Sequence, residues 1–240
     1  MASTFPATVY RHRLPTRLWH WLNALCLYLL FTSGLGIFNA HPRLYWGEYG
    51  ANFDPAWLQL DRFPGWLTLP FRYDLAMSRH WHLLAAPVFA FSLLAFMMTS
   101  MANGHFRRDL AFRKSELAPS HIWQDIKDHA RLRFPVGEAA TRYNILQKCA
   151  YNTLIFLILP ILILTGLAMS PGMDAAWPWL TQIWGGRQTA RSVHFLFAWA
   201  TLAFFLVHIA MVVFAGPANE LRSMLTGWYR TPEDRERAGR

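Results

Sequence analysis

The sequence predicts an all-α integral membrane protein, a four-transmembrane-helix bundle with both termini cytoplasmic. Only 15% of its 240 residues are charged, whereas a soluble domain carries about 25%. Four long stretches contain no Asp, Glu, Lys or Arg, and the basic residues gather in alternate segments between them. A lipid-embedded protein accounts for all three observations.

The uncharged stretches are the predicted spans, because each exceeds the roughly 20 residues that cross a hydrocarbon core about 30 Å thick. We expect one transmembrane domain over residues 1–230, followed by a charged tail at 231–240. The amino terminus lacks the layout of a cleaved signal, so the first span is expected to stay in the mature protein. The expected spans are residues 18–40, 80–104, 147–171 and 191–215.

The basic residues give the orientation. Seventeen of the 23 lie in residues 1–17, 107–148 and 220–240, and only six lie in the two remaining loops. The positive-inside rule therefore predicts that both termini and the 107–148 loop are cytoplasmic. Because the basic residues flank spans rather than form one solvated face, the net charge of +9 does not indicate nucleic-acid binding.

The two longest loops have different characters. The 43–79 loop, on the predicted outer side, is rich in tryptophan, proline and glycine, which suits the membrane interface or a docked protein. The 107–148 loop contains SHIWQDIKDHARLRF, which predicts an amphipathic helix lying on the membrane surface.

Several kinds of site are not encoded. There is no nucleophile–base pair and no phosphate-binding loop, so no catalytic residue is predicted. Cys26 and Cys149 form no CxxC motif, which excludes a zinc, c-type haem or iron–sulfur motif, and both are expected to be small buried hydrophobic residues.

Four histidines lie within or at the ends of the predicted spans. Ionisable side chains at membrane depth are costly and normally face a partner inside the bundle. With alternating helix directions, His82 and His194 fall near the outer face and His20 near the cytoplasmic face. His208 follows His194 by 14 residues, about 21 Å further in and close to four full turns. The depths predict two pairs, His82 with His194 and His20 with His208.

Paired imidazoles on facing helices are a common way for a helix bundle to hold a cofactor. Bis-imidazole ligation of haem iron leaves no open position, which suits electron transfer rather than oxygen chemistry. The sequence therefore predicts two b-type haems. His80 is the second choice for the ligand of the second span, and the loop histidines are expected to be solvated, namely His12, His41, His105, His121 and His129.

Arginines and glycines extend this pattern. An arginine stands three residues before three of the four histidines, and positions i and i+3 share a helix face. These arginines, Arg17, Arg79 and Arg191, are predicted to pair with haem propionates or, in the alternative, to reach lipid phosphate. Gly34 and Gly166 allow close approach either to a flat ring or to another helix.

These motifs resemble the bacterial di-haem cytochrome b subunits found with nickel–iron hydrogenases, formate dehydrogenases and thiosulfate reductases, within the bacterial cytochrome b561 superfamily. The resemblance covers nearly the whole chain and rests on RLWHWLN in the first span, the RxxH opening of the second, TGLAMSP ending the third and H-x13-H in the fourth. It implies a four-helix bundle in the inner membrane, with the histidine pairs as haem ligands.

The resemblance also suggests partners. RYNILQK is similar to a stretch of the formate dehydrogenase branch that lines a quinone pocket, which implies that Asn144 and Gln147 contact quinone. From the residues alone, the same pair equally suits a helix cap. The long 43–79 loop favours a periplasmic redox enzyme of the thiosulfate-reductase-like or molybdenum-containing type over hydrogenase.

The function predicted is a membrane subunit that carries electrons through two b-type haems between that enzyme and the quinone pool. One alternative is a free-standing haem quinone reductase with a small diffusible donor. A second alternative, from a different class, is a histidine-lined transition-metal transporter. A transporter predicts histidines along one pore rather than two pairs with arginines one turn above.

Overall fold

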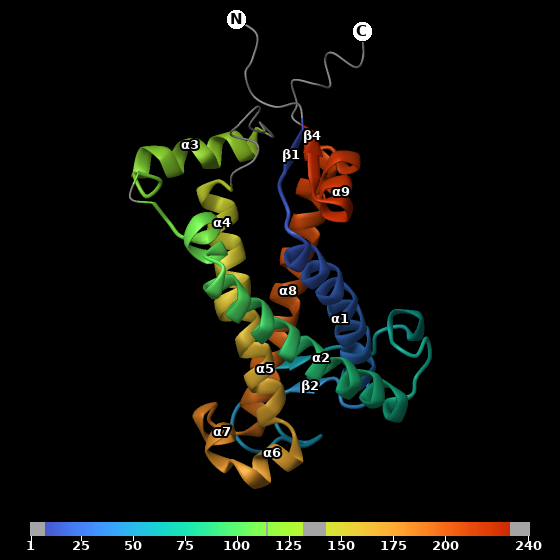
Figure 1. Ribbon diagram of the computed structural model, residues 1–240. Coiled ribbons are helices and arrows are strands. Elements are labelled where there is room, and N and C mark those ends of the chain that lie inside the picture. The colour runs from blue at the N-terminus through green and yellow to red at the C-terminus, as the bar shows by residue number, and fades with distance from the viewer. Residues whose placement is uncertain (1–7, 114, 132–142, 231–240) are drawn as a thin grey trace, which may run out of the picture. The chain divides into compact units, whose positions relative to one another are not determined.

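The computed structural model describes residues 8–113, 115–131 and 143–230. The predicted tail at 231–240 lies outside these residues. Four helical segments are long and apolar enough to cross a membrane: α1 (Leu14–Phe38), α2 (Leu75–Ala102), Ile145–Ala168 and α8 (Arg187–Ala215). This confirms an all-α, multi-pass membrane protein. Figure 1 shows these long helices with the shorter elements at their ends.

The spans begin and end within a few residues of the predicted positions. The largest difference is at α2, which begins at Leu75 rather than residue 80. Asp74 explains the earlier start, because its carboxylate accepts a hydrogen bond from the backbone N–H of Met77 at 3.0 Å. An acceptor at this position satisfies a donor that the first helical turn leaves unpaired.

The third span is not a regular helix throughout. α4 (Ile145–Thr153) passes into a π-helical turn at Leu154–Ile158 and then into α5 (Leu159–Ala168). Pro160 is the second residue of α5, and its missing N–H and bulky ring disturb the preceding turn of a regular helix.

The described chain forms two compact units. The first unit comprises residues 1–20, 95–154 and 204–240. In it, β1 (Thr8–Tyr10) pairs antiparallel with β4 (Trp228–Arg230), which follows α9 (Pro217–Thr226). Figure 1 shows the strands side by side next to α9. This pairing places the two ends of the described chain together, which agrees with the predicted even number of spans.

The first unit also contains the amphipathic helix predicted in the 107–148 loop, as α3 (Pro119–Ala130). A π-helical turn at Phe106–Leu110 follows α2. The loop is anchored to α4 by a partly buried ion pair, in which the Nζ of Lys148 lies 2.8 Å from both carboxylate oxygens of Glu116. Burial opposes ionisation of Glu116, but hydrogen bonds from Lys148 and the Arg113 backbone outweigh it and lower the pKa of this carboxyl.

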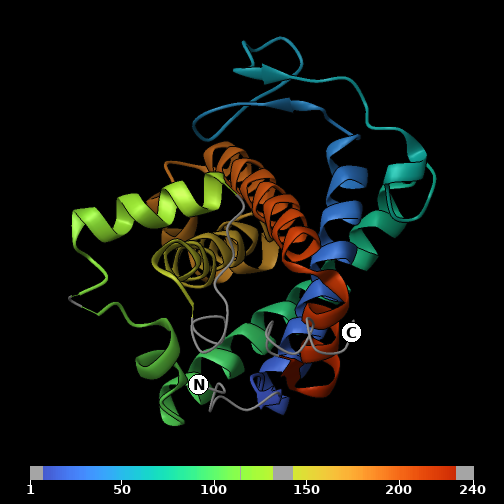
Figure 2. The same cartoon turned by 90° about the horizontal axis from the view of Figure 1, so that it is seen from above.

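The second unit comprises residues 21–94 and 155–203. Its 43–79 loop contains a short antiparallel strand pair, β2 (Arg43–Leu44) with β3 (Leu58–Gln59), and a 3₁₀ turn at Gly65–Leu67. Figure 2 shows the two strands lying side by side. Two short helices, α6 (Pro171–Ala176) and α7 (Pro178–Ile183), join α5 to α8. Sequence patterns did not predict these small elements.

The spans carry apolar side chains outward and small polar ones inward, as a lipid solvent requires. Leu22, Leu84 and Phe91 are among many exposed apolar residues, whereas Ser33, Ser78 and Thr165 are fully buried. α1 and α2 meet closely at Gly36, where a Cβ atom would lie 2.2 Å from the Ser78 hydroxyl. Cys26 is buried as expected, but Cys149 is exposed, which corrects that expectation.

Candidate functional site

In the second unit, His82 of α2 and His194 of α8 face each other. Their ring centroids are 6.3 Å apart, and the ring planes cross at 61°. His80, the second choice for this position, is exposed. The structure therefore brings together the pair that the depth argument predicted.

Each of these rings is held by a hydroxyl group on a neighbouring span. The Nδ1 of His82 lies 3.0 Å from the Ser33 hydroxyl of α1, and the Nδ1 of His194 lies 3.0 Å from the Thr165 hydroxyl of α5. Ser33 and Thr165 were not predicted as site residues. The available signal was a hydroxyl residue directly before a glycine in two different spans, TSG and LTG.

The glycines that follow the hydroxyl residues contact the same rings. A Cβ atom at Gly34 would lie 3.6 Å from the Cε1 of His82, and one at Gly166 would lie 3.5 Å from the Cε1 of His194. These contacts are made with histidine side chains of another span, as Gly36 makes its contact with Ser78. Approach of Gly34 and Gly166 to a cofactor ring stays a prediction.

In the first unit, His20 of α1 faces His208 of α8, again with ring centroids 6.3 Å apart and with an interplanar angle of 55°. The His208 ring is stacked on Phe204, one turn earlier, at 5.9 Å and 6°. Phe204 in turn contacts Tyr151 of α4 edge-on at 6.2 Å. An aromatic path thus leads from the start of the third span to His208.

The separation of both pairs suits a shared metal. Metal–imidazole bonds are about 2.0 Å long, and a ring nitrogen lies about 1.2 Å from the ring centre, so two imidazoles on opposite sides of one metal have centres about 6.4 Å apart. Both observed separations are 6.3 Å. The residues therefore fit bis-imidazole ligation. The described residues contain no group of three or more His, Cys, Asp or Glu side chains that could hold a metal ion.

The three arginines have different surroundings. Arg17 donates hydrogen bonds to the carbonyl oxygens of Met224 and Leu225 at the end of α9. Arg191 donates to the carbonyl oxygen of His41 and lies over the Phe38 ring at 6.0 Å. Arg79 is exposed. A guanidinium has five N–H donors, so the bonds to backbone leave further donors for an anion.

Asn144 and Gln147 form a reciprocal capping box at the start of α4. The Asn144 side chain accepts a hydrogen bond from the backbone N–H of Gln147 at 2.9 Å, and the Gln147 side chain accepts from the backbone N–H of Asn144 at 3.3 Å. The capping alternative is therefore realised. Asn144 also contacts the Nε2 of His129 at 3.3 Å.

Some loop histidines are less exposed than predicted. Burial, with a smaller contribution from Arg11, lowers the pKa of His12 to about 3. His105 is mostly buried, and its Nδ1 lies 2.7 Å from an Asp109 carboxylate oxygen. The expectation of solvated side chains is wrong for both, because the loops fold back on the ends of the spans. His121 is half exposed, in agreement with it.

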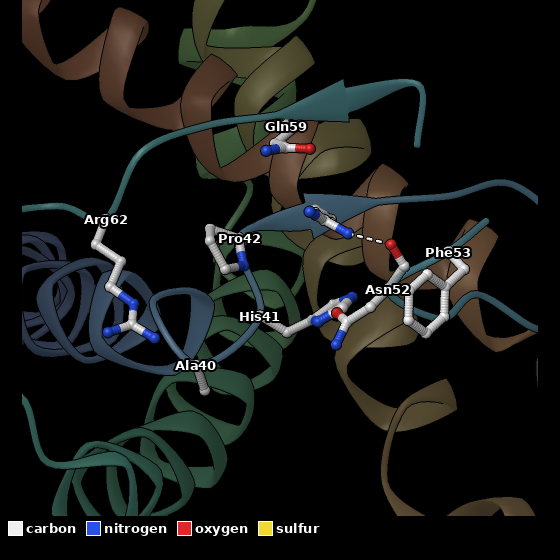
Figure 3. Close-up of a pocket in the computed structure, with 8 residues that line it drawn as sticks. Ala40, His41, Pro42, Asn52, Phe53, Gln59 and Arg62 are labelled. Carbon is white, nitrogen blue, oxygen red and sulfur yellow. Dashed lines mark hydrogen bonds between the residues drawn. The ribbon is translucent and has the colours of Figure 1, made fainter. Parts of the chain in front are cut away.

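Two cavities have linings without the paired histidines. One, of about 550 Å³, lies at the end of α1 and is lined by Pro42, Gln59 and Arg62 among others. Figure 3 shows that its lining comes from the α1 end and the β2–β3 segment. The other, of about 390 Å³ in the first unit, is lined by cationic side chains such as Arg11, Arg13 and Arg113. Neither lining includes a histidine of the two pairs.

Comparison with known proteins finds similarity over most of the chain. The family model described as prokaryotic cytochrome b561 matches residues 11–227. A probable Ni/Fe-hydrogenase B-type cytochrome subunit of Cupriavidus necator is 26% identical over 94% of this chain and 88% of its own length. A putative protein-methionine-sulfoxide reductase subunit, YedZ1, of Azospira oryzae is 28% identical over 82% of this chain and 86% of its own length.

Proposed function

We propose that this membrane cytochrome b, which belongs to the prokaryotic cytochrome b561 family, is the electron-transfer subunit of a respiratory complex in the bacterial inner membrane. It would carry electrons through two b-type haems between a periplasmic redox enzyme and the quinone pool. The observation that carries the proposal is the common 6.3 Å separation of two histidine pairs. Haem, when bound, supplies a one-electron couple.

The chain's own residues would hold and orient the haems. His82 and His194 ligate one haem, and His20 and His208 ligate the other. Gly34 and Gly166 leave the Cε1 edges of His82 and His194 uncovered. Arg17, Arg79 and Arg191 provide cations one turn from three of the ligands, where they can pair with propionates.

The quinone is proposed to bind near the start of α4. Tyr143 and Tyr151 lie 5.3 Å apart, and Tyr151 leads through Phe204 to His208. This path supports a site close to the haem of the first unit. Asn144 and Gln147 remain the proposed contacts, through the side-chain N–H groups that the capping box does not use.

The periplasmic enzyme is proposed to dock on the 43–79 loop. Trp46 and Trp57 stack at 5.1 Å, and Trp46 remains half exposed, as do other aromatic side chains of this loop. Aromatic and arginine side chains are enriched in protein interfaces. The names of the relatives support a hydrogenase or another oxidoreductase as the partner class, and a molybdenum-containing enzyme remains within that class.

The first test is a reduced-minus-oxidised visible spectrum of the detergent-purified protein, with haem quantified per chain. We expect a b-type spectrum and two haems per chain. His194→Ala and His208→Ala should each lose a different haem, whereas His121→Ala, at a half-exposed loop position, should lose none. Absence of haem, or retention of both haems in both ligand variants, would overturn the assignment and favour a metal transporter.

A further inference from the structure

The two histidines of the second unit sit in matching environments built by unrelated segments. Ser33–Gly34 of α1 faces His82, and Thr165–Gly166 of α5 faces His194. In each case the hydroxyl contacts Nδ1 at 3.0 Å, and the following glycine lies beside Cε1. The contacts join residues 49 and 29 positions apart, so they follow from the fold rather than from local sequence.

The direction of each hydrogen bond can be worked out from the remaining partners. A hydroxyl has one hydrogen to donate. The Ser33 hydroxyl lies 2.5 Å from the carbonyl oxygen of Leu29, and the Thr165 hydroxyl lies 2.6 Å from that of Ile161. Because a carbonyl can only accept, each hydroxyl donates to its own helix. Each must then accept from the imidazole, which places the ring hydrogen on Nδ1 and leaves Nε2 as a metal ligand.

A hydrogen bond from Nδ1–H increases the electron density on the opposite nitrogen and so raises the basicity of the ligand. A more basic ligand favours ferric over ferrous iron, and hydrogen bonding around the ligands is one of the means by which proteins set haem potentials. Ser33 and Thr165 are both fully buried at membrane depth. Water cannot replace either hydroxyl there.

We propose that Ser33 and Thr165 are positioning residues for the haem held by His82 and His194, and that their hydroxyls orient the two ligands and lower the reduction potential of that haem alone. The proposal rests on the proposed function, since it requires a haem at this pair. The carbonyl oxygens of Leu30 and Leu162 are further hydrogen-bond partners of the two rings. Loss of one hydroxyl should therefore change the potential without releasing the haem.

A purely structural role for the hydroxyls is the competing explanation. Buried serine and threonine commonly donate to the carbonyl four residues earlier. Thr201 of α8 provides the comparison within this chain, because its hydroxyl donates to the Phe197 carbonyl at 2.9 Å and it is likewise buried. A structural role predicts that removing the Thr201 hydroxyl has the same effect as removing the Thr165 hydroxyl.

The test is a spectroelectrochemical titration of the haem-loaded protein, with the low-spin ferric EPR signal as a second readout of ring orientation. Ser33→Ala and Thr165→Val should each raise the midpoint potential of one haem. The oxidised-to-reduced equilibrium of that haem should shift by about two- to tenfold, as expected for the loss of one hydrogen bond, and tenfold is about 59 mV for one electron. The shifted haem should be the one missing from His194→Ala. Ser33→Thr and Thr165→Ser, which retain the hydroxyl, and Thr201→Val should keep wild-type potentials.

The outcomes separate the proposal from its premise. Unchanged potentials in both Ser33→Ala and Thr165→Val, equal shifts of both haems, or the same shift in Thr201→Val would overturn the positioning role while leaving the two-haem assignment intact. Loss of haem from Ser33→Ala and Thr165→Val would overturn it as well, because the hydroxyls would then be needed to hold the haem rather than to set its potential. A wild-type protein without two b-type haems would instead overturn the proposed function.

Discussion

The clearance between Gly166 and the His194 ring makes a size series at this position a direct test of the site. A Cβ atom at residue 166 would lie 3.5 Å from the Cε1 of His194, which is an ordinary van der Waals contact. Gly166→Ala should therefore be tolerated and retain both haems. Gly166→Val should not, because its two γ-carbons extend about 1.5 Å further and a β-branched side chain in a helix has one strongly preferred rotamer.

The expected magnitude follows from the cost of overpacking, which is about 1–3 kcal/mol for a well-packed interior. If that cost falls on the ligand ring, haem binding at this pair weakens by about 5- to 150-fold, because each 1.4 kcal/mol is a factor of ten. Gly34→Ala and Gly34→Val should repeat the pattern, since the Cβ atom there would lie 3.6 Å from the His82 ring. The affected haem should be the same one in both series.

The assay is haem content per chain by pyridine haemochrome, together with the visible spectrum, after purification in the same detergent. Gly172→Val is the matched control, because no atom lies within 4 Å of a Cβ atom at that position. Two haems per chain with a wild-type spectrum in Gly166→Val and Gly34→Val would refute the reasoning that these glycines make room at a haem site. Equal haem loss in Gly172→Val would refute it as well, since the effect would then be unrelated to the ring.

Three further predictions concern the ends of the bundle. Lys148→Met should lower the free energy of unfolding by about 1–3 kcal/mol, because it removes the cation that pairs with the partly buried Glu116 carboxylate. Thermal unfolding should show recovery in Lys148→Met/Glu116→Leu, and no recovery would count against the pair. Burial and Arg11 lower the pKa of His12 to about 3. The contribution of His12 to stability is therefore complete above the unfolded pKa near 6.5 and is lost as the pH falls toward 3. His12→Gln should reduce the acid sensitivity of unfolding between these pH values, and an unchanged acid profile would contradict the prediction. In intact cells, a membrane-impermeant thiol reagent should label a cysteine placed at Tyr49 but not one at His121, and the opposite pattern would reverse the predicted orientation.

The parts of the fold that sequence predicted are those set by the bilayer. Span length, the absence of charge and the side of the basic residues are consequences of lipid acting on each segment separately. The histidine pairs were predictable for the same reason, because depth along a helix follows from counting residues at a fixed rise. His20 and His208 meet as expected although they lie at opposite ends of the chain.

The parts that sequence did not predict depend on contacts between distant segments. The β1–β4 pair joins residues about as far apart as the described chain allows, from Thr8 to Arg230, and no periodicity in either strand indicates its partner. The partners of Arg17 are carbonyl oxygens at the end of α9, which an i, i+3 pattern cannot reveal. The capping box of Asn144 and Gln147 was recognisable as one of two readings, because a cap requires only local geometry.

The polar requirements of a membrane interior link the hydroxyls to the metal. A neutral imidazole carries one donor and one acceptor, and both need partners where water is excluded. Ser33 and Thr165 satisfy the donors of His82 and His194. The two remaining acceptors cannot satisfy each other, because neither has a hydrogen to give. A positively charged metal held between the rings, as proposed, would satisfy both acceptors, and the 6.3 Å separation of the ring centres leaves room for it. On this reasoning the hydroxyls, the glycines and the ring separation all follow from one requirement, which is a partner for each nitrogen of the two buried rings.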